Sequence, residues 1–274
     1  MAQRLNADFC LFGIFDGHGG DEVSRVLPEM VGKEFKKRFL IATKIDKDKI
    51  GQILGATFME VDKQLRASDK NYEAKGSTGA VVVVHREFIV AAHCGDTRIQ
   101  IFGNESSISN PSLKTRPKTK LIYNSTDHKP NHPIENTRIT RAGGEVFMNR
   151  ISTKQCPIGI SVARSFGDFR FKSNIESVDR DRLEKMDNLM IVNPEIAVID
   201  LEGSEKPKSE TNTKTKIKSI LIACDGVTDV LSNNDIKIIH DTSDFKDLSS
   251  NLVMEAYREG SLDNISACCV EILC

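Results

Sequence analysis

A short stretch near the start of the chain joins an apolar strand to residues that could bind a metal ion. Residues 11–15, LFGIF, are apolar and predict a buried β-strand. The strand ends at Asp16, Gly17 and His18, and two more glycines follow. Hard cations prefer carboxylate and carbonyl oxygens, which Asp16 and an unhindered Gly17 could supply. The alternative is a glycine-rich turn in which Asp16 is merely hydrated.

Three more aspartates share this placement. Asp96, Asp225 and Asp263 each lie beside an apolar run, at a turn that contains Gly or Asn. Taken singly, each is explained by the frequent use of Asp in turns. Because the placement recurs, we expect the carboxylates to converge at one edge of the sheets, where like charges raise one another's pKa or repel. A divalent cation resolves that conflict. No His or Cys cluster accompanies the acids and no DxDxDG loop occurs, so Mg²⁺ or Mn²⁺ is favoured over Zn²⁺ and Ca²⁺.

The elements that must position these residues recur along the whole chain. Hydrophobic periodicity predicts helices at 19–39, 46–67, 136–142, 233–239 and 247–258. Apolar runs predict strands at 11–15, 81–84, 88–94, 99–102, 196–201, 220–224 and 265–272. Polar segments predict surface loops at 104–120 and 203–218 and a flap at 169–190. No repeat or linker divides the chain, which predicts a single domain over residues 1–274.

Composition bounds the class of protein. The chain has 274 residues, of which 39% are hydrophobic and 28% charged, enough for one sizeable core. Its net charge of -1 gives no global attraction to nucleic acid, and no apolar run has the length of a membrane helix. Seven cysteines without a CxxC pair predict neither a zinc motif nor a disulfide framework. We therefore expect a reducing compartment, cytoplasmic or nuclear, and no signal peptide is recognisable in residues 1–10.

Eight motifs occur in a fixed order from Leu11 to the last residues of the chain. They are FDGHGG, GSTGA, AHCGDTR, DHKP, ITRAGGEV, ISVARSFGD, ACDGVTDVLSNND and GSLDNIS. As a set they closely resemble the type 2C (PPM) metal-dependent protein serine/threonine phosphatases. The resemblance implies an α+β fold, a four-layer αββα sandwich with two central antiparallel β-sheets, and a metal-binding cleft at one edge between the sheets.

The same resemblance implies roles for the acidic residues. Asp16 matches a carboxylate that bridges two core metal ions, Mg²⁺ or Mn²⁺, and the Gly17 carbonyl matches a ligand of one of them. Asp225 and Asp263 match ligands of the other. A weaker third ion matches a set of three aspartates, Asp96, Asp225 and Asp229.

The implied reaction is hydrolysis of phosphoserine and phosphothreonine in proteins by a metal-activated water. Two divalent ions can lower the pKa of a shared water and clamp an in-line displacement, so no Cys or Ser nucleophile is needed. His18 matches the general acid that would protonate the leaving alkoxide; the alternative is a hydrated turn histidine. The expected partners are phosphorylated proteins, with no nucleic acid and no membrane span, and the expected state is a monomer.

Two departures from the family pattern keep an alternative open. Thr228 stands where the family usually has Trp, which we expect to affect packing more than chemistry. The family's first strand carries an Arg that binds the substrate phosphate, whereas this chain begins only fifteen residues before Asp16 and Arg4 is too close to take that role. We therefore expect that the family's N-terminal strand is lacking. The alternative function is a catalytically impaired pseudophosphatase that acts as a binding or regulatory module. A metal-dependent nuclease fits the carboxylates but not the net charge or the motif order.

Overall fold

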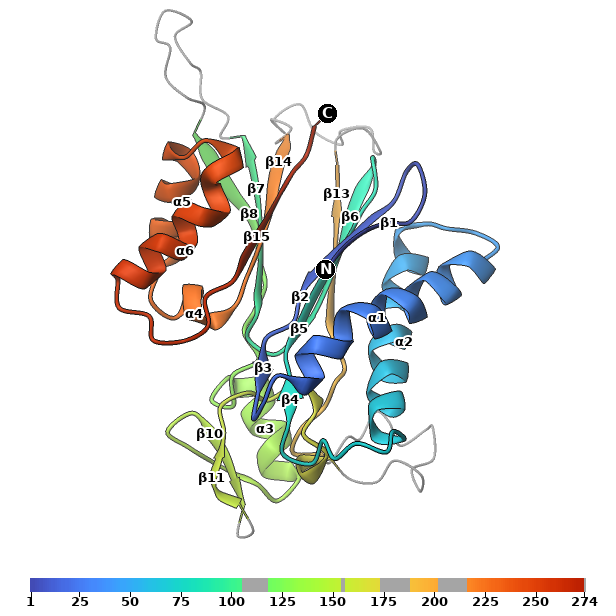
Figure 1. The fold of residues 1–274 in the computed structure, drawn as a ribbon, viewed down its shortest axis with the longest axis vertical. Coiled ribbons are helices and arrows are strands. Elements are labelled where there is room, and N and C mark those ends of the chain that lie inside the picture. Colours follow the sequence, from blue (N-terminus) through green and yellow to red (C-terminus); the bar gives the residue numbers. More distant parts are fainter. Residues whose placement is uncertain (105–117, 154–155, 173–187, 202–215, 274) are drawn as a thin grey trace, which may run out of the picture.

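Two antiparallel β-sheets packed face to face form the centre of the molecule, with helices on both outer faces (Figure 1). The computed structural model describes residues 1–104, 118–153, 156–172, 188–201 and 216–273. The order of layers, helices, sheet, sheet, helices, confirms the predicted α+β sandwich.

The first sheet has five strands, in the order β1 (Ala2–Arg4), β2 (Cys10–Ile14), β5 (Gly79–Val84), β6 (Phe88–Cys94) and β13 (Glu195–Asp200). Its central strand β5 is covered on both faces, which explains the unbroken apolar sequence. Val81 and Val83 pack toward the helices, and Ala80 and Val82 pack toward the second sheet. This alternation is the period of two that a strand imposes on its side chains.

The second sheet has four strands, in the order β15 (Ala267–Glu271), β14 (Ile217–Ala223), β7 (Arg98–Asn104) and β8 (Thr119–Asn124). Its inner face contributes Ile99 and Ile101 from β7, which lie opposite Ile222 and Ile220 of β14. All four side chains are fully buried in the layer between the sheets. Burial of this apolar surface holds the two sheets together.

Helices α1 (Glu22–Ile41) and α2 (Lys47–Arg66) cover the first sheet, and α4 (Asp225–Thr228), α5 (Asn233–Thr242) and α6 (Leu248–Arg258) cover the second. Helix α2 begins where the Asp46 carboxylate accepts a hydrogen bond from the Lys49 amide at 2.9 Å. Its residues Ile50, Leu54 and Phe58 recur at helical spacing and are fully buried against the sheet.

The predicted boundary of α5 is confirmed by a capping box. The Ser232 hydroxyl accepts from the Asp235 amide at 3.2 Å, and the Asp235 carboxylate accepts from the Ser232 amide at 3.0 Å. Helix α1 is continuous past Pro28, a position at which a kink was possible.

Smaller elements gather at one end of the sandwich (Figure 1). A three-stranded sheet joins β12 (Phe166–Gly167), β4 (Gly76–Ser77) and β3 (Gly17–His18). Beside it lie α3 (Pro133–Arg141), β9 (Glu145–Phe147), β10 (Arg150–Thr153), β11 (Cys156–Ile160) and the 3₁₀ turn Phe169–Phe171. These elements have their own small core, which includes Ile139, Ile151 and Met190.

Some predicted segments fall largely outside the described residues. This applies to most of the loops 104–120 and 203–218 and to residues 173–187 of the flap. The described ends of the flap segment, Phe169, Phe171 and Met190, are buried. The sequence analysis did not identify β1, β8 or the β9–β11 sheet. Among the described helices, none is both long and apolar enough to span a membrane.

The contact between α2 and the first sheet predicts a large loss of stability when a buried side chain is shortened. Leu54→Ala should lower the free energy of unfolding by about 2–5 kcal/mol, because a cavity replaces a fully buried leucine. Leu40→Ala is the matched control, since Leu40 is also helical but 67% exposed. Urea denaturation followed by circular dichroism measures both; equal effects would show that α2 is not packed as described.

Candidate metal centre

Three aspartates lie at the same edge of the sandwich because the strands before them run toward that edge. Asp16 follows β2, Asp96 lies in the turn between β6 and β7, and Asp225 follows β14 and begins α4. In Figure 1 this is the lower edge, next to β3 and β4. The predicted convergence of Asp16 and Asp225 is thereby confirmed for the described structure.

Asp16 and Asp225 are close neighbours, with a carboxylate oxygen of each within 4.8 Å of the other. Burial, together with the charge of Asp16, raises the pKa of Asp225 to about 7. The pKa of Asp16 is also raised, first by burial and then by the charges of Asp263 and Asp96. Like charges at this range oppose the ionisation of both groups. A divalent cation would relieve that repulsion.

The donor atoms at this pair fit a hard divalent cation. One ligand atom each from Asp16, Asp225 and Cys224 lie within 4.8 Å of one another. Burial raises the pKa of Cys224 to about 11, so its thiol stays protonated and the carboxylates remain as donors. The Asp225 Oδ1 atom is buried and has no hydrogen-bond partner within the described structure. An all-oxygen set of this kind suits Mg²⁺ or Mn²⁺.

Gly226 allows the segment that carries Asp263 to approach Asp225. A Cβ atom at position 226 would lie 2.3 Å from the Asn264 carbonyl oxygen, so a side chain cannot fit there without moving the backbone. Asp263 itself does not join the pair. It is exposed, and its carboxylate accepts a hydrogen bond from the Asn264 amide at 2.7 Å. Its charge raises the pKa of Asp16.

Asp263 therefore lies at the rim of the centre. With Asp225 and Asp229 it lines an open hollow of about 470 Å³. A second hollow, of about 620 Å³, is lined by Asp16 and Gly17. Both carboxylates can thus be reached from solvent.

Asp96 and Asp229 are joined by a lysine that the sequence analysis did not single out. Lys129 Nζ lies 2.9 Å from Asp96 Oδ2 and 3.3 Å from Asp229 Oδ1. Burial raises the pKa of Asp96 to about 6, although Lys129 opposes the rise. The ammonium group thus lies between two of the three aspartates expected to hold a third ion. Lys129 belongs to the DHKP motif, and this motif was the sequence signal that could have identified it.

His18 is held by a carboxylate that the sequence analysis also left without a role. His18 Nε2 lies 2.6 Å from Asp168 Oδ2, and the Ser165 hydroxyl donates to the same oxygen at 2.6 Å. Burial alone would lower the pKa of His18, but the hydrogen bond and charge of Asp168, with smaller effects of Asp96 and Asp16, raise it. His18 therefore favours the protonated form.

The backbone around Asp168 is shaped for this contact. A Cβ atom on Gly76 would lie 2.0 Å from Asp168 Oδ2 and 2.5 Å from His18 Nε2, so only glycine leaves room. Asp168 itself has a left-handed backbone with φ of 53°, and its amide donates to the Lys75 carbonyl at 2.9 Å. The acid that ends the ISVARSFGD motif was the signal for this contact.

A buried ion pair fixes the segment on either side of Asp168. Asp62 of α2 accepts from the Gly167 amide at 2.9 Å and from Lys172 Nζ at 2.8 Å. Lys172 Nζ also donates to the Ser165 carbonyl at 2.8 Å. Helix α2 thereby anchors the residues that carry Asp168, and through it the orientation of His18.

Comparisons with known proteins agree on one family. The family model described as Protein phosphatase 2C matches residues 1–265. Human protein phosphatase 1A is 27% identical over 268 residues, which cover 93% of this chain and 60% of that protein. Probable protein phosphatase 2C 2 of Paramecium tetraurelia is 26% identical over 273 residues, covering 95% of this chain and 77% of that protein.

A solved structure shares the fold. The crystal structure of serine-threonine phosphatase 2C from Toxoplasma gondii matches with a TM-score of 0.71 at 20% identity, over 98% of this chain and 87% of that chain. The likeness supports the four-layer architecture. The chain spans about 60% of the length of protein phosphatase 1A.

The raised pKa of Asp225 predicts how pH acts on the metal-free protein. Between the ordinary value of 3.8 and about 7, the folded state holds a proton that the unfolded chain releases, so stability falls as pH rises. After chelation, the melting temperature should fall between about pH 5 and about pH 7.5, and Asp225→Asn should flatten this slope.

Added Mn²⁺ should raise the melting temperature more at the higher pH, because protons compete for the same oxygens. Differential scanning fluorimetry measures these shifts. Asp247→Asn, a change to an exposed carboxylate at the start of α6, is the control and should leave the slope as it is. A Mn²⁺ effect independent of pH would contradict the proposed competition.

Proposed function

The chain belongs to the protein phosphatase 2C family, and from this premise we propose that it hydrolyses phosphoserine and phosphothreonine in proteins in a metal-dependent reaction. The observation that carries the proposal is the pair Asp16 and Asp225, two carboxyl groups with ligand oxygens within 4.8 Å of each other at an accessible edge. Phosphorylated proteins are the proposed substrates, in keeping with a site that is open rather than enclosed.

Asp16, Asp225 and the Gly17 carbonyl would hold the core ions, and Asp263 would join them by a movement of its exposed turn. Metal ions bound there supply a water of lowered pKa and positive charge for the phosphate oxygens. Asp16 and Asp225 would contribute carboxylate oxygens to these ions. Strands β2 and β14, which precede the two residues, hold them at the same edge of the sandwich.

His18 is the proposed proton donor to the leaving group. A serine or threonine alkoxide is a poor leaving group unless it is protonated, and general acid catalysis contributes about 10²–10⁴-fold in such steps. Asp168 holds Nε2 of His18, which leaves Nδ1 as the nitrogen that can face the substrate. The raised pKa of His18 favours the doubly protonated ring, in which Nδ1 also carries a proton.

Two observations favour the second candidate, an impaired pseudophosphatase that binds partners. Lys129 lies between Asp96 and Asp229, and Asp263 is bonded to its own neighbour Asn264 rather than to the central pair. Both features would weaken ion binding. Metal-dependent turnover separates the two functions, because a binding module would take up ions without hydrolysing a phosphopeptide.

Activity should require a divalent ion and depend more on Asp16 than on Asp96. We expect hydrolysis of a phosphoserine peptide with Mn²⁺ and none after chelation. Asp16→Asn should lower kcat/KM by more than about 100-fold, since loss of an outer-shell partner alone costs about 10–100-fold. Asp96→Asn, the matched control, should cost less because the Asp96 carboxylate is already paired with Lys129. Full turnover after exhaustive chelation would exclude the mechanism.

The effect on kcat of substituting His18 or Asp168 should depend on the leaving group of the substrate. His18→Gln should lower kcat on a phosphoserine peptide by about 10²–10⁴-fold and act far less on an aryl phosphate, whose phenolate leaves without protonation. Asp168→Asn should act in the same direction, and it should shift the alkaline limb of the pH profile downward because the charge that raises the pKa of His18 is lost. Thermal unfolding checks that each variant is folded. Equal losses on both substrates would instead indicate a structural role.

A further inference from the structure

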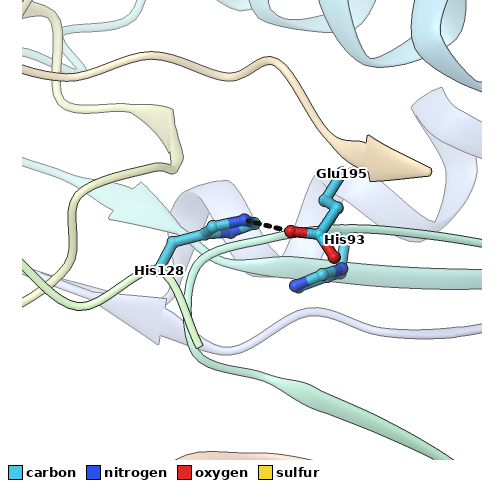
Figure 2. A group of neighbouring side chains, drawn as sticks. All are labelled: His93, His128 and Glu195. Carbon is cyan, nitrogen blue, oxygen red and sulfur yellow. Dashed lines mark ion pairs between the residues drawn. The ribbon is translucent and has the colours of Figure 1, made fainter. Parts of the chain in front are cut away.

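A second cluster of potential ligands lies in the layer between the two sheets. His93 is near the end of β6, and Glu195, the first residue of β13, pairs with it directly across the sheet. His128 comes from the segment after β8. Figure 2 shows the Glu195 carboxylate extending toward both imidazole rings. Because the histidines are buried and Glu195 is 43% exposed, the cluster opens to solvent on the side of the carboxylate.

The three side chains are spaced as ligands of one ion. One ligand atom from each lies within 4.8 Å of the other two. The imidazole rings are stacked, with centroids 4.5 Å apart and an interplanar angle of 11°. His128 Nε2 lies 3.6 Å from Glu195 Oε2, which is too far for a hydrogen bond. A gap therefore remains between His128 Nε2 and Glu195 Oε2, which are not joined by a direct hydrogen bond.

Three buried polar atoms around this gap lack a hydrogen-bond partner in the described structure. They are His93 Nδ1, His128 Nε2 and the hydroxyl of Tyr123 on β8. Burial and the charge of Glu195 raise the pKa of Tyr123 to about 12. Buried polar groups are rarely left unpaired, so several unpaired atoms around one carboxylate indicate an additional occupant.

The protonation states suit a metal ion. Burial, with the neighbouring His128, lowers the pKa of His93 to about 4, and burial also lowers the pKa of His128. Contact with His128 lowers the pKa of Glu195 despite its partial burial. Neutral imidazoles and a carboxylate are the forms that coordinate metals, and these shifts favour them.

His93 is already in the tautomer that a ligand needs. Its Nε2–H donates to the Thr126 carbonyl oxygen at 2.8 Å, so the lone pair is on Nδ1, the atom that faces the gap. A backbone carbonyl behind the second nitrogen is the usual support of a metal-binding histidine, because it fixes the ring and increases its basicity.

We propose that His93, His128 and Glu195 form a binding site for a divalent transition metal ion, with Zn²⁺ as the representative ion, separate from the aspartate centre. Two nitrogens and one carboxylate oxygen are a common zinc set with a fourth position open, at ligand distances of about 2.0–2.2 Å. Mg²⁺ avoids nitrogen ligands, so the two sites would select different ions. The bound ion would link β6, β13 and the segment that leads to Lys129.

Binding has a local cost at His128. The Gly95 amide donates to His128 Nδ1 at 3.2 Å, so in the ion-free protein the ring proton is on Nε2. Coordination through Nε2 moves that proton to Nδ1 and breaks the bond from Gly95. Because Gly95 precedes Asp96, the ion would loosen the turn that carries this aspartate, and amide hydrogen exchange at Gly95 should become faster when Zn²⁺ is bound.

The test uses a protein in which the aspartate centre cannot bind zinc. In the variant Asp16→Asn/Asp225→Asn, we expect one equivalent of Zn²⁺ to bind, measured by competition with a chromogenic chelator. Adding His93→Asn or Glu195→Gln should weaken binding by at least about tenfold, since even outer-shell losses reach that size. Adding His132→Asn, which removes a histidine outside the cluster, should leave the affinity unchanged.

A second set of measurements tests whether the Glu195→Gln variant is correctly folded. Glu195→Gln keeps the shape of a partly exposed side chain, so its circular dichroism and melting temperature should match those of the parent variant. Zn²⁺ should raise the melting temperature of the parent and not of the Glu195→Gln protein. Co²⁺ bound to the parent should show the visible absorption of a low-coordinate nitrogen site. Absence of Zn²⁺ binding by the parent, or equal affinity in the His93→Asn, Glu195→Gln and His132→Asn proteins, would overturn the proposal.

Discussion

Repulsion between two half-buried carboxylates is the main constraint at this end of the molecule. Asp16 and Asp225 are brought together by strands β2 and β14, which belong to different sheets, and neither can ionise fully while the other is charged. The sandwich forces this proximity because its inner faces must stay packed. Close backbone approach at Gly226 holds the neighbouring turn against the pair. The fold thus maintains a local conflict of charge that a divalent cation relieves.

Other buried acids in the described structure form ion pairs with basic side chains. Asp62 is paired with Lys172, and Glu135 with two arginines. Asp96 contacts Lys129. By contrast, among the described residues no Lys or Arg forms an ion pair with Asp16 or Asp225. Within the described structure, the other buried acids thus have a basic side chain as counter-ion, whereas Asp16 and Asp225 have none. For this reason the pair is the candidate metal centre.

The surroundings of His18 show how far positioning extends from the reacting groups. Gly76 leaves the space in which His18 meets Asp168, and the Asp62–Lys172 pair holds the backbone on both sides of that acid. In its proposed role as proton donor, a ring fixed in this way would lose little entropy. Helix α2 thereby helps to orient His18.

Local patterns in the sequence determined the elements and the turns. The run of residues 11–15 followed by Asp16 predicted a strand that ends in a candidate ligand, and Ser232 predicted the start of α5. The α+β class and the convergence of Asp16 with Asp225 were predicted as well. These features can be read from sequence because burial and turn formation depend on neighbours a few residues away.

Only the tertiary structure decided which distant groups touch. Asp168 meets His18 across 150 residues of sequence, and Lys129 reaches Asp96. The motifs contain all four residues but do not indicate which of them meet. Asp263 was expected among the ligands and lies at the rim. The cluster of His93, His128 and Glu195 has no zinc-like spacing, because its members come from three separate segments. Such contacts arise when sheets and loops pack against one another, and side-chain packing of that kind leaves no periodic trace in the sequence.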